Sequence, residues 1–185
     1  MISVNRQGQR VQLRAAAVVL HEDDVLLHRA PGDERWALPG GRVAFGEEAS
    51  TTAVRDMKEE LGEAVSCGPF LDIGENFIDL AGQRNHEFGL YLLVSLGEEL
   101  PYRDNTRVHI GVEDLPKLEF RWVALKTLGT VDLRPSSFEA VRPAVRWRSL
   151  TLFGSNDAQP LPRADDLPRK LPLPRLAVHV QRLGP

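Results

Sequence analysis

Three carboxylates stand close together in the first half of the chain, at Asp56, Glu59 and Glu60. On an α-helix these positions are i, i+3 and i+4, so the three side chains share one face. Like charges this close repel one another, and divalent cations such as Mg²⁺ or Mn²⁺, which prefer oxygen ligands, would offset the repulsion. The spacing therefore predicts a metal site suited to water attack on a phosphate anhydride, because a bound metal neutralises phosphate charge and lowers the pKa of the attacking water.

Residues around the carboxylates support this interpretation. Pro39-Gly40-Gly41 breaks the chain with a bare backbone that can approach a metal or a phosphate closely. Arg55 precedes Glu59 by one helical turn and can brace it. The alternative for any pair of helical glutamates is a solvated acidic face. The Gly-Gly loop, together with Glu47 and Arg55 at fixed offsets, favours the metal site, since several independent features agree.

The segment 41–63 resembles the signature motif of the Nudix hydrolases, G-x5-E-x7-R-E-U-x-E-E-x-G-U, where U is a bulky aliphatic residue. Met57 fills the first U, and the preceding segment 36–41 is the usual lead-in of the family. Two positions depart from the pattern, because Asp56 replaces a glutamate and Glu63 replaces an aliphatic residue. The matched positions are Gly41, Glu47, Arg55, Glu59, Glu60 and Gly62.

The resemblance implies a role for each of these side chains. Glu47 and Arg55 would hold the loop and the helix together, with Arg55 orienting the carboxylates. Asp56 is one methylene shorter than the glutamate of the family, so it would bind a metal either directly or through a water. The metal ligands implied are the Gly40 carbonyl, Asp56, Glu59 and Glu60, and the catalytic residues implied are Glu47, Arg55, Glu59 and Glu60.

Three residues outside the motif match positions that contact substrate or metal in some members. Arg29 would contact a substrate phosphate, Glu119 would touch a nucleobase, and Glu87 would be an additional metal ligand or a general base. The alternative for each is an ordinary charge at a strand end or on an exposed strand. Trp36 and Phe77 could stack on a base, although aromatic residues at strand edges more often belong to the core.

A helix over 48–61 must position the carboxylates. Its apolar residues recur every four positions, and Gly62 is well placed to end it. The carboxylate face lies about 120° from this apolar stripe, so the helix is expected to bury one side and present the three carboxylates on another. The stripe consists of Ala49, Ala53, Met57 and Leu61.

Strands are expected at 11–20, 25–29, 69–78, 86–96 and 118–125, and the first two and the next two read as hairpins. A second helix is expected over 136–148, where Pro143 limits it. The resemblance implies the α+β, α/β/α-sandwich fold of the Nudix type, with a mixed sheet packed between helices. The expected domain covers 1–154.

Residues 155–185 hold six of the 13 prolines. This composition excludes a helix interior or a central strand, so a mostly extended tail is expected. The sharper alternative is a Pro-rich recognition segment.

Composition and charge exclude several classes of protein. With 185 residues, one cysteine and 42% hydrophobic residues, the chain is neither disordered nor a disulfide scaffold. Its 23 Lys and Arg against 26 Asp and Glu give a net charge of −3, so no nucleic acid polymer is expected as a partner. We expect no membrane span, no signal peptide, a cytoplasmic location and a possible homodimer.

The function expected is hydrolysis of a pyrophosphate bond in a nucleoside di- or triphosphate derivative, with Mg²⁺ or Mn²⁺ as cofactor. The alternative is a catalytically weak Nudix-fold module that senses a nucleotide or binds a partner. Downstream residues that separate subfamilies do not identify the substrate. The places where ADP-ribose and dinucleoside-polyphosphate members carry a proline or a tyrosine hold Ile78, Asp79 and Leu80.

Overall fold

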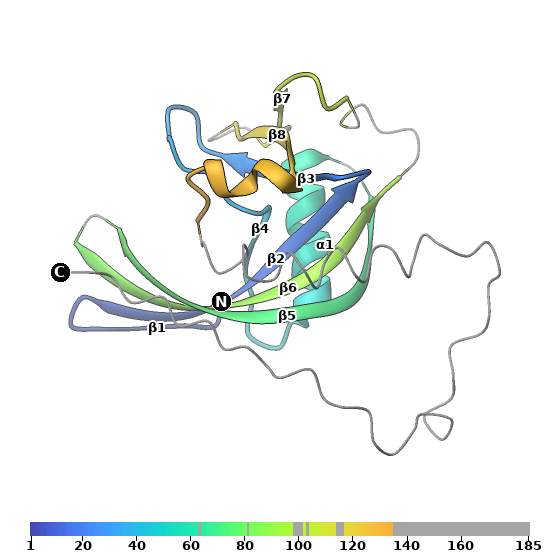
Figure 1. Ribbon diagram of the computed structural model, residues 1–185. Helices are drawn as coiled ribbons and strands as arrows, with labels where there is room; N and C mark the ends of the chain where they lie inside the picture. Colours follow the sequence, from blue (N-terminus) through green and yellow to red (C-terminus); the bar gives the residue numbers. More distant parts are fainter. Residues whose placement is uncertain (63, 81, 98–101, 103, 114–116, 135–185) are drawn as a thin grey trace, which may run out of the picture.

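β-Strands dominate the described part of this computed structural model, which comprises residues 1–62, 64–80, 82–97, 102, 104–113 and 117–134. One α-helix and one 3₁₀ helix accompany them there (Figure 1). The elements are β1 (Ser3–Arg6), β2 (Gln9–His21), β3 (Asp24–Arg29), β4 (Gly40–Arg42), α1 (Ala49–Leu61), β5 (Val65–Leu80), β6 (Gln83–Leu96), β7 (His109–Ile110), β8 (Glu119–Ala124) and η2 (Leu125–Thr130).

The strand β2 organises the sheet. The strand order is β5-β6-β2-β3-β8-β7, and β1 and β4 pair with β2 as well. β2 runs parallel to β6 and antiparallel to its other partners, so the sheet is mixed, as expected. The middle of β2, 15–19, is buried and almost wholly apolar, which suits a strand that is covered on both faces.

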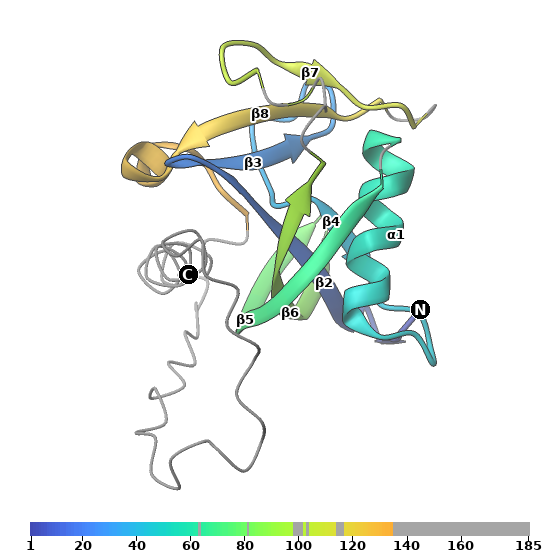
Figure 2. The same cartoon turned by 90° about the vertical axis from the view of Figure 1, so that its right-hand side faces the viewer.

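The helix α1 packs against one face of the sheet (Figure 2). Ala53, Met57 and Leu61 are buried against apolar side chains of the sheet, which confirms the predicted stripe. Gly62 ends the helix in the left-handed conformation, with φ of 76°, and its N–H donates to the Lys58 carbonyl at 2.9 Å. The predicted start and end of this helix are therefore correct within one residue.

A second apolar cluster covers the other face of the sheet. It joins Trp36 and Leu38 to Tyr91 and to Leu128 of η2. The sheet thus has apolar cores on both faces, in keeping with the expected layered fold. The expected helix at 136–148, the tail at 155–185, the domain boundary at 154 and the departure at Glu63 lie outside the described residues.

The expected strands are all present, and the two hairpins β2-β3 and β5-β6 are confirmed by antiparallel pairing. β1, β4, β7 and η2 are additional elements that the sequence did not predict. β4 was read as a loop because of its two glycines, yet Gly41 and Gly40 pair with Ala15 and Ala16 of β2. No helix in the described segments is long and apolar enough to cross a membrane.

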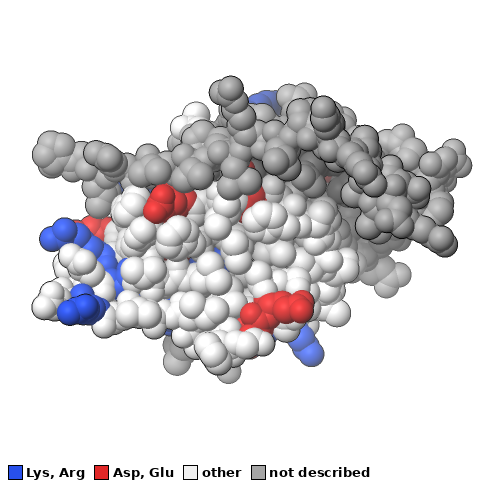
Figure 3. All heavy atoms as spheres, turned by 90° about the horizontal axis from the view of Figure 1, so that it is seen from below, with Lys and Arg blue, Asp and Glu red and all other residues white. Residues whose placement is uncertain are grey.

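Charged side chains are sparse on one side of the molecule. On the face shown in Figure 3, the Lys, Arg, Asp and Glu side chains of the described residues form a few small groups, with wide uncharged areas between these groups. A protein that binds a nucleic acid polymer through its phosphates needs a continuous basic surface. This face has none among the described residues.

Candidate active site

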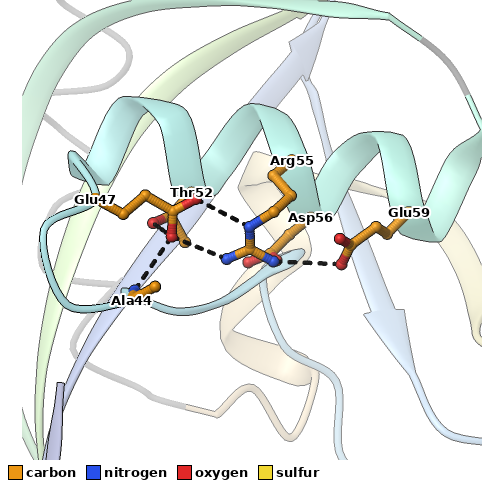
Figure 4. A network of polar contacts seen from close by, with 6 residues as sticks. All are labelled: Ala44, Glu47, Thr52, Arg55, Asp56 and Glu59. Atoms are coloured by element: carbon orange, nitrogen blue, oxygen red, sulfur yellow. Dashed lines mark hydrogen bonds and ion pairs between the residues drawn. The ribbon is translucent and has the colours of Figure 1, made fainter. Parts of the chain in front are cut away.

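A network of hydrogen bonds joins the loop before α1 to the helix (Figure 4). Glu47 Oε2 accepts hydrogen bonds from the Ala44 N–H at 3.1 Å, from Thr52 Oγ1 at 2.8 Å and from Arg55 Nη2 at 3.1 Å. Glu47 Oε1 accepts from Arg55 Nε at 2.9 Å. These bonds, above all those from Arg55, lower the pKa of Glu47 to about 2. The network ties the loop to the helix, as the resemblance implies.

The same guanidinium reaches two carboxylates further along α1. Arg55 Nη1 lies 2.5 Å from Asp56 Oδ1 and 3.3 Å from Glu59 Oε2. Its bonds to Glu47 are the largest cause of a raised Arg55 pKa, so the side chain stays charged. Arg55 therefore connects the loop to two of the three carboxylates expected as metal ligands.

Asp56 is buried against the backbone of β4. Its carboxyl oxygen Oδ2 is buried without a hydrogen-bond partner, and a Cβ atom added at Gly41 would stand only 2.6 Å from it. Burial raises the pKa of Asp56 to about 6, and the charges of Glu60 and Glu59 add to this effect while Arg55 opposes it. Glycine at position 41 allows this close approach.

Glu60 is also buried, facing β3. Its Oε2 lies 3.2 Å from His28 Nδ1, but the geometry is not that of a hydrogen bond, and both atoms are buried without another partner. The side chain of Glu59 is 55% exposed. The helix was expected to bury its apolar side and to present the three carboxylates on another face, but two of the three, Asp56 and Glu60, are buried as well. The reason is that Gly41 of β4 lies against Asp56 and His28 of β3 lies beside Glu60, so both carboxylates are buried.

The donors around α1 fit a divalent cation in their chemistry. Asp56 Oδ2 and Glu60 Oε2 are buried carboxylate oxygens without partners, and oxygen is the donor that such cations prefer. Gly40 supports the bare backbone beside them, with φ of 123° and no room for a Cβ atom against the Ala15 carbonyl. Within the described residues, no three His, Cys, Asp or Glu side chains already form a cluster that could hold a metal ion.

A pocket of about 300 Å³ adjoins this site. Arg29 lines it, donating through Nε to Glu119 Oε2 at 2.8 Å and through Nη1 to the Asp33 carbonyl at 3.1 Å. Arg29 and Glu119 are thus brought together. The pocket is lined by Gln12, Arg14, His28, Arg29, Ala30, Asp33, Arg35, Trp36, Ala37, Ile78, Asn85, Glu87, Leu118 and Arg134.

Glu87 lies on the floor of the pocket and is only 3% exposed, so it is not an ordinary exposed strand charge. Gln12 Nε2 donates to its Oε2 at 2.7 Å, and Asn76 Nδ2 donates to its Oε1 at 3.5 Å. The parallel register of β2 and β6 places Gln12 beside Glu87. Glu87 therefore offers a fixed, hydrogen-bonded carboxylate to the pocket.

Of the two aromatic candidates for base stacking, Trp36 forms part of the pocket wall, whereas Phe77 does not line the pocket. Trp36 is 4% exposed, and the guanidinium carbons of Arg29 and Arg121 lie 4.5 and 4.6 Å from its ring centroid. Phe77 packs on His86 with ring centroids 4.5 Å apart, and its strand neighbour Ile78 lines the pocket. Because side chains alternate along a strand, Phe77 points away from the pocket. Trp36 belongs to the core, which is the alternative that the sequence left open.

Several residues of this region were not recognised in the sequence. Four of them have a polar side chain within a mainly apolar strand, which is the signal that could have found them, whereas the two arginines at positions 35 and 134 lie outside the strands and carry no such signal. Arg14 Nη2 donates to the Leu38 carbonyl at 3.1 Å, and its charge lowers the pKa of Asp56. The residues missed are Gln12, Arg14, His28, Arg35, Asn85 and Arg134.

Comparison with known proteins identifies the family. A family model described as the NUDIX domain matches residues 11–148. A Mycobacterium tuberculosis protein that carries the name MutT4 is 33% identical over 94 residues, which is 50% of this chain and 34% of the relative. This chain therefore matches about a third of the length of that relative.

Solved structures share the fold. A NUDIX hydrolase from Nitrosomonas europaea has a TM-score of 0.52 and 16% identity, over 80% of this chain and 99% of that one. A MutT protein from Methanosarcina mazei Go1 has a TM-score of 0.50 and 22% identity, over 75% of this chain and 95% of that one. With the family model covering most of the chain and the motif residues gathered around α1, this protein belongs to the NUDIX domain family.

Proposed function

We propose that the protein is a divalent-metal-dependent hydrolase that cleaves a phosphoanhydride bond in a nucleoside di- or triphosphate derivative by water attack at phosphorus. The observation that carries this proposal is the pair of partnerless buried carboxylate oxygens, Asp56 Oδ2 and Glu60 Oε2, beside the bare backbone of β4. A buried carboxylate without a partner is costly for the fold. Retaining two of them is understandable if a cation binds there.

The residues that would hold Mg²⁺ or Mn²⁺ are Asp56, Glu59, Glu60 and the Gly40 carbonyl, and the metal would supply charge neutralisation on phosphate and a more acidic water. Arg55 keeps Asp56 and Glu59 in place through its Nη1 contacts. Glu47 anchors Arg55 in turn. These two residues act as positioning residues, since they fix the carboxylates.

The pocket would bind the nucleotide. Four arginines line it, and guanidinium groups bind phosphate oxygens in a bidentate manner. Arg29 is held in place by Glu119, so Glu119 orients a phosphate-binding side chain. Glu87 would accept a hydrogen bond from the substrate or take a proton from the attacking water. The four arginines are Arg14, Arg29, Arg35 and Arg134.

The test is a screen of nucleoside triphosphates and nucleoside-diphosphate-linked compounds for phosphate release, with Mg²⁺, with Mn²⁺ and with EDTA. We expect turnover that depends on the metal. Turnover should fall by more than about 100-fold in Glu60→Gln, because losing a direct metal ligand should cost more than losing a residue that only supports a ligand. Glu48→Gln, at an exposed position at the start of the same helix, should leave turnover unchanged.

Two results would contradict the proposal. Turnover that persists both in EDTA and in Glu60→Gln would exclude the metal-dependent reaction. If the protein binds a nucleotide but hydrolyses none of the screened compounds, the alternative of a sensing module is supported. A kcat/KM above roughly 10⁴ M⁻¹s⁻¹, the lower end for ordinary enzymes, would exclude that alternative.

A further inference from the structure

Four buried side-chain atoms of the described residues lack a hydrogen-bond partner, and three of them belong to Asp56, to Glu60 and to His28, which lies beside Glu60. Asp56 Oδ2 and Glu60 Oε2 belong to the candidate metal site. The third is His28 Nδ1, a ring nitrogen 3.2 Å from Glu60 Oε2. The site therefore contains a nitrogen donor that neither the motif nor the family match assigns.

His28 is held firmly in this position. Its backbone N–H donates to the Ala37 carbonyl at 2.8 Å, and its own carbonyl accepts from the Ala37 N–H at 2.9 Å. Its ring packs at a tilt on Phe120, with centroids 5.7 Å apart, and the residue is only 9% exposed. His28 also lines the pocket. A fixed imidazole at the junction of pocket and carboxylates is well placed to meet a bound ion.

We propose that His28 Nδ1 is a ligand of the metal site and shifts its selectivity from Mg²⁺ toward transition-metal ions. Carboxylate, carbonyl and water oxygens suit Mg²⁺, whereas an imidazole nitrogen binds first-row transition metals more strongly, increasingly from Mn²⁺ to Co²⁺. The inference rests on the metal site of the proposed function. It departs from the ligand set implied by the motif, which consists of oxygen atoms alone.

The test compares the binding of Mg²⁺, Mn²⁺ and Co²⁺, each added alone to the full chain and followed by calorimetry. His28→Ala should weaken Co²⁺ binding by about 10–100-fold, which is the scale for losing a contact that supports a metal site. The binding of Mn²⁺ should be weakened less than that of Co²⁺, and the binding of Mg²⁺ by less than about 2-fold, because the three ions differ in this order in their affinity for nitrogen ligands. The matched control is His86→Ala, another histidine that contacts a glutamate, since its Nε2 lies 2.7 Å from Glu75 Oε1. It should change none of the three affinities.

A spectroscopic measurement keeps the test decisive if His28→Ala fails to fold. Mn²⁺ bound to the unaltered protein should show magnetic coupling to an imidazole ¹⁴N nucleus in electron spin-echo spectra, and His86→Ala should retain this coupling. Absence of the coupling, or equal weakening of all three metals in a folded His28→Ala, would overturn the proposal, since His28 would then act only on Glu60. Failure of the proposed function is recognised separately, because Glu60→Gln would then leave all metal binding unchanged.

Discussion

Two carboxylates of this protein are touched by the same guanidinium, yet their environments shift their pKa values in opposite directions. Glu47 accepts four hydrogen bonds, two of them from Arg55, and its pKa falls to about 2. Asp56 has one oxygen on Arg55 and the other buried without a partner, and its pKa rises to about 6. Burial is the largest cause of the raised pKa of Asp56, whereas hydrogen bonds from Arg55 are the largest cause of the lowered pKa of Glu47. The comparison teaches that an adjacent arginine does not by itself decide the direction of the shift. Glu47 stabilises the fold, while Asp56 keeps an oxygen available for a ligand.

Removing the shared guanidinium should have the largest effect on stability. Arg55→Ala deletes two of the four hydrogen bonds to Glu47 and the partner of Asp56 Oδ1. Because hydrogen bonds between charged groups contribute about 1.5–3 kcal/mol each and Arg55 is partly exposed, we expect the free energy of unfolding to fall by about 2–3 kcal/mol. Urea unfolding in EDTA measures this.

Arg107→Ala is the matched control for this experiment. Arg107 also forms an ion pair, with Asp104 at 3.1 Å, but its side chain is 61% exposed. Exposed pairs contribute about 0–1 kcal/mol, so this variant should unfold almost like the parent. Equal losses in the two variants would show that Arg55 is an ordinary surface arginine.

The second prediction concerns Asp56 and pH. A carboxyl whose pKa is raised by folding, here from 3.8 to about 6, stabilises the fold fully below the unfolded value and loses that contribution as pH rises through the folded value. Asp56→Asn should therefore raise the free energy of unfolding of the metal-free protein by about 1–3 kcal/mol at pH 8. Urea titrations at each pH should show that this gain in the free energy of unfolding shrinks between pH 6 and pH 4.

Bound metal should reverse the order of stability of the parent protein and the Asp56→Asn variant. A ligand that binds only the folded state stabilises it, and the parent retains the carboxylate proposed to bind the cation. Saturating Mn²⁺ should thus raise the melting temperature of the parent more than that of Asp56→Asn. A parent and variant with the same pH profile in EDTA would mean that Asp56 is solvated.

The smallest effect should come from the hydroxyl that completes the Glu47 network. Thr52→Val keeps the shape of this fully buried residue but removes the donor 2.8 Å from Glu47 Oε2. We expect a loss of about 1 kcal/mol, since one net hydrogen bond is removed. Thr51→Val, at the exposed neighbouring position, should change stability by less than half of this. A larger loss in Thr51→Val would assign the effect to helix propensity instead.

The sequence allowed prediction of the elements whose signals are local. The apolar stripe of Ala53, Met57 and Leu61 predicted α1, and Gly62 predicted its end, because helix periodicity and capping depend on near neighbours. The family resemblance likewise implied that Glu47 and Arg55 belong together. These two residues are only eight positions apart, on the loop and on the helix that follows it.

Burial of the carboxylates could not be predicted in this way. Asp56 is buried because Gly41 pairs with Ala15 of β2, a contact between distant segments that no local pattern reveals. The partner of Glu87 depends similarly on the parallel register that brings Gln12 beside it. His28 escaped notice because a single polar residue near the end of an apolar strand has no periodic signal of its own.

The central position of β2 has a consequence for the order in which the protein is assembled. Gln12 and Glu87, which meet on the pocket floor, are 75 positions apart in the chain. Contacts of this kind form slowly, since a long loop must close before they are made, whereas the β5-β6 hairpin needs only a short turn. A nascent chain that has left the ribosome as far as Gly62 carries the complete helix α1, but β6 has not yet emerged to pair with β2. The pocket is therefore completed late in synthesis, after the residues expected to perform the chemistry have already emerged.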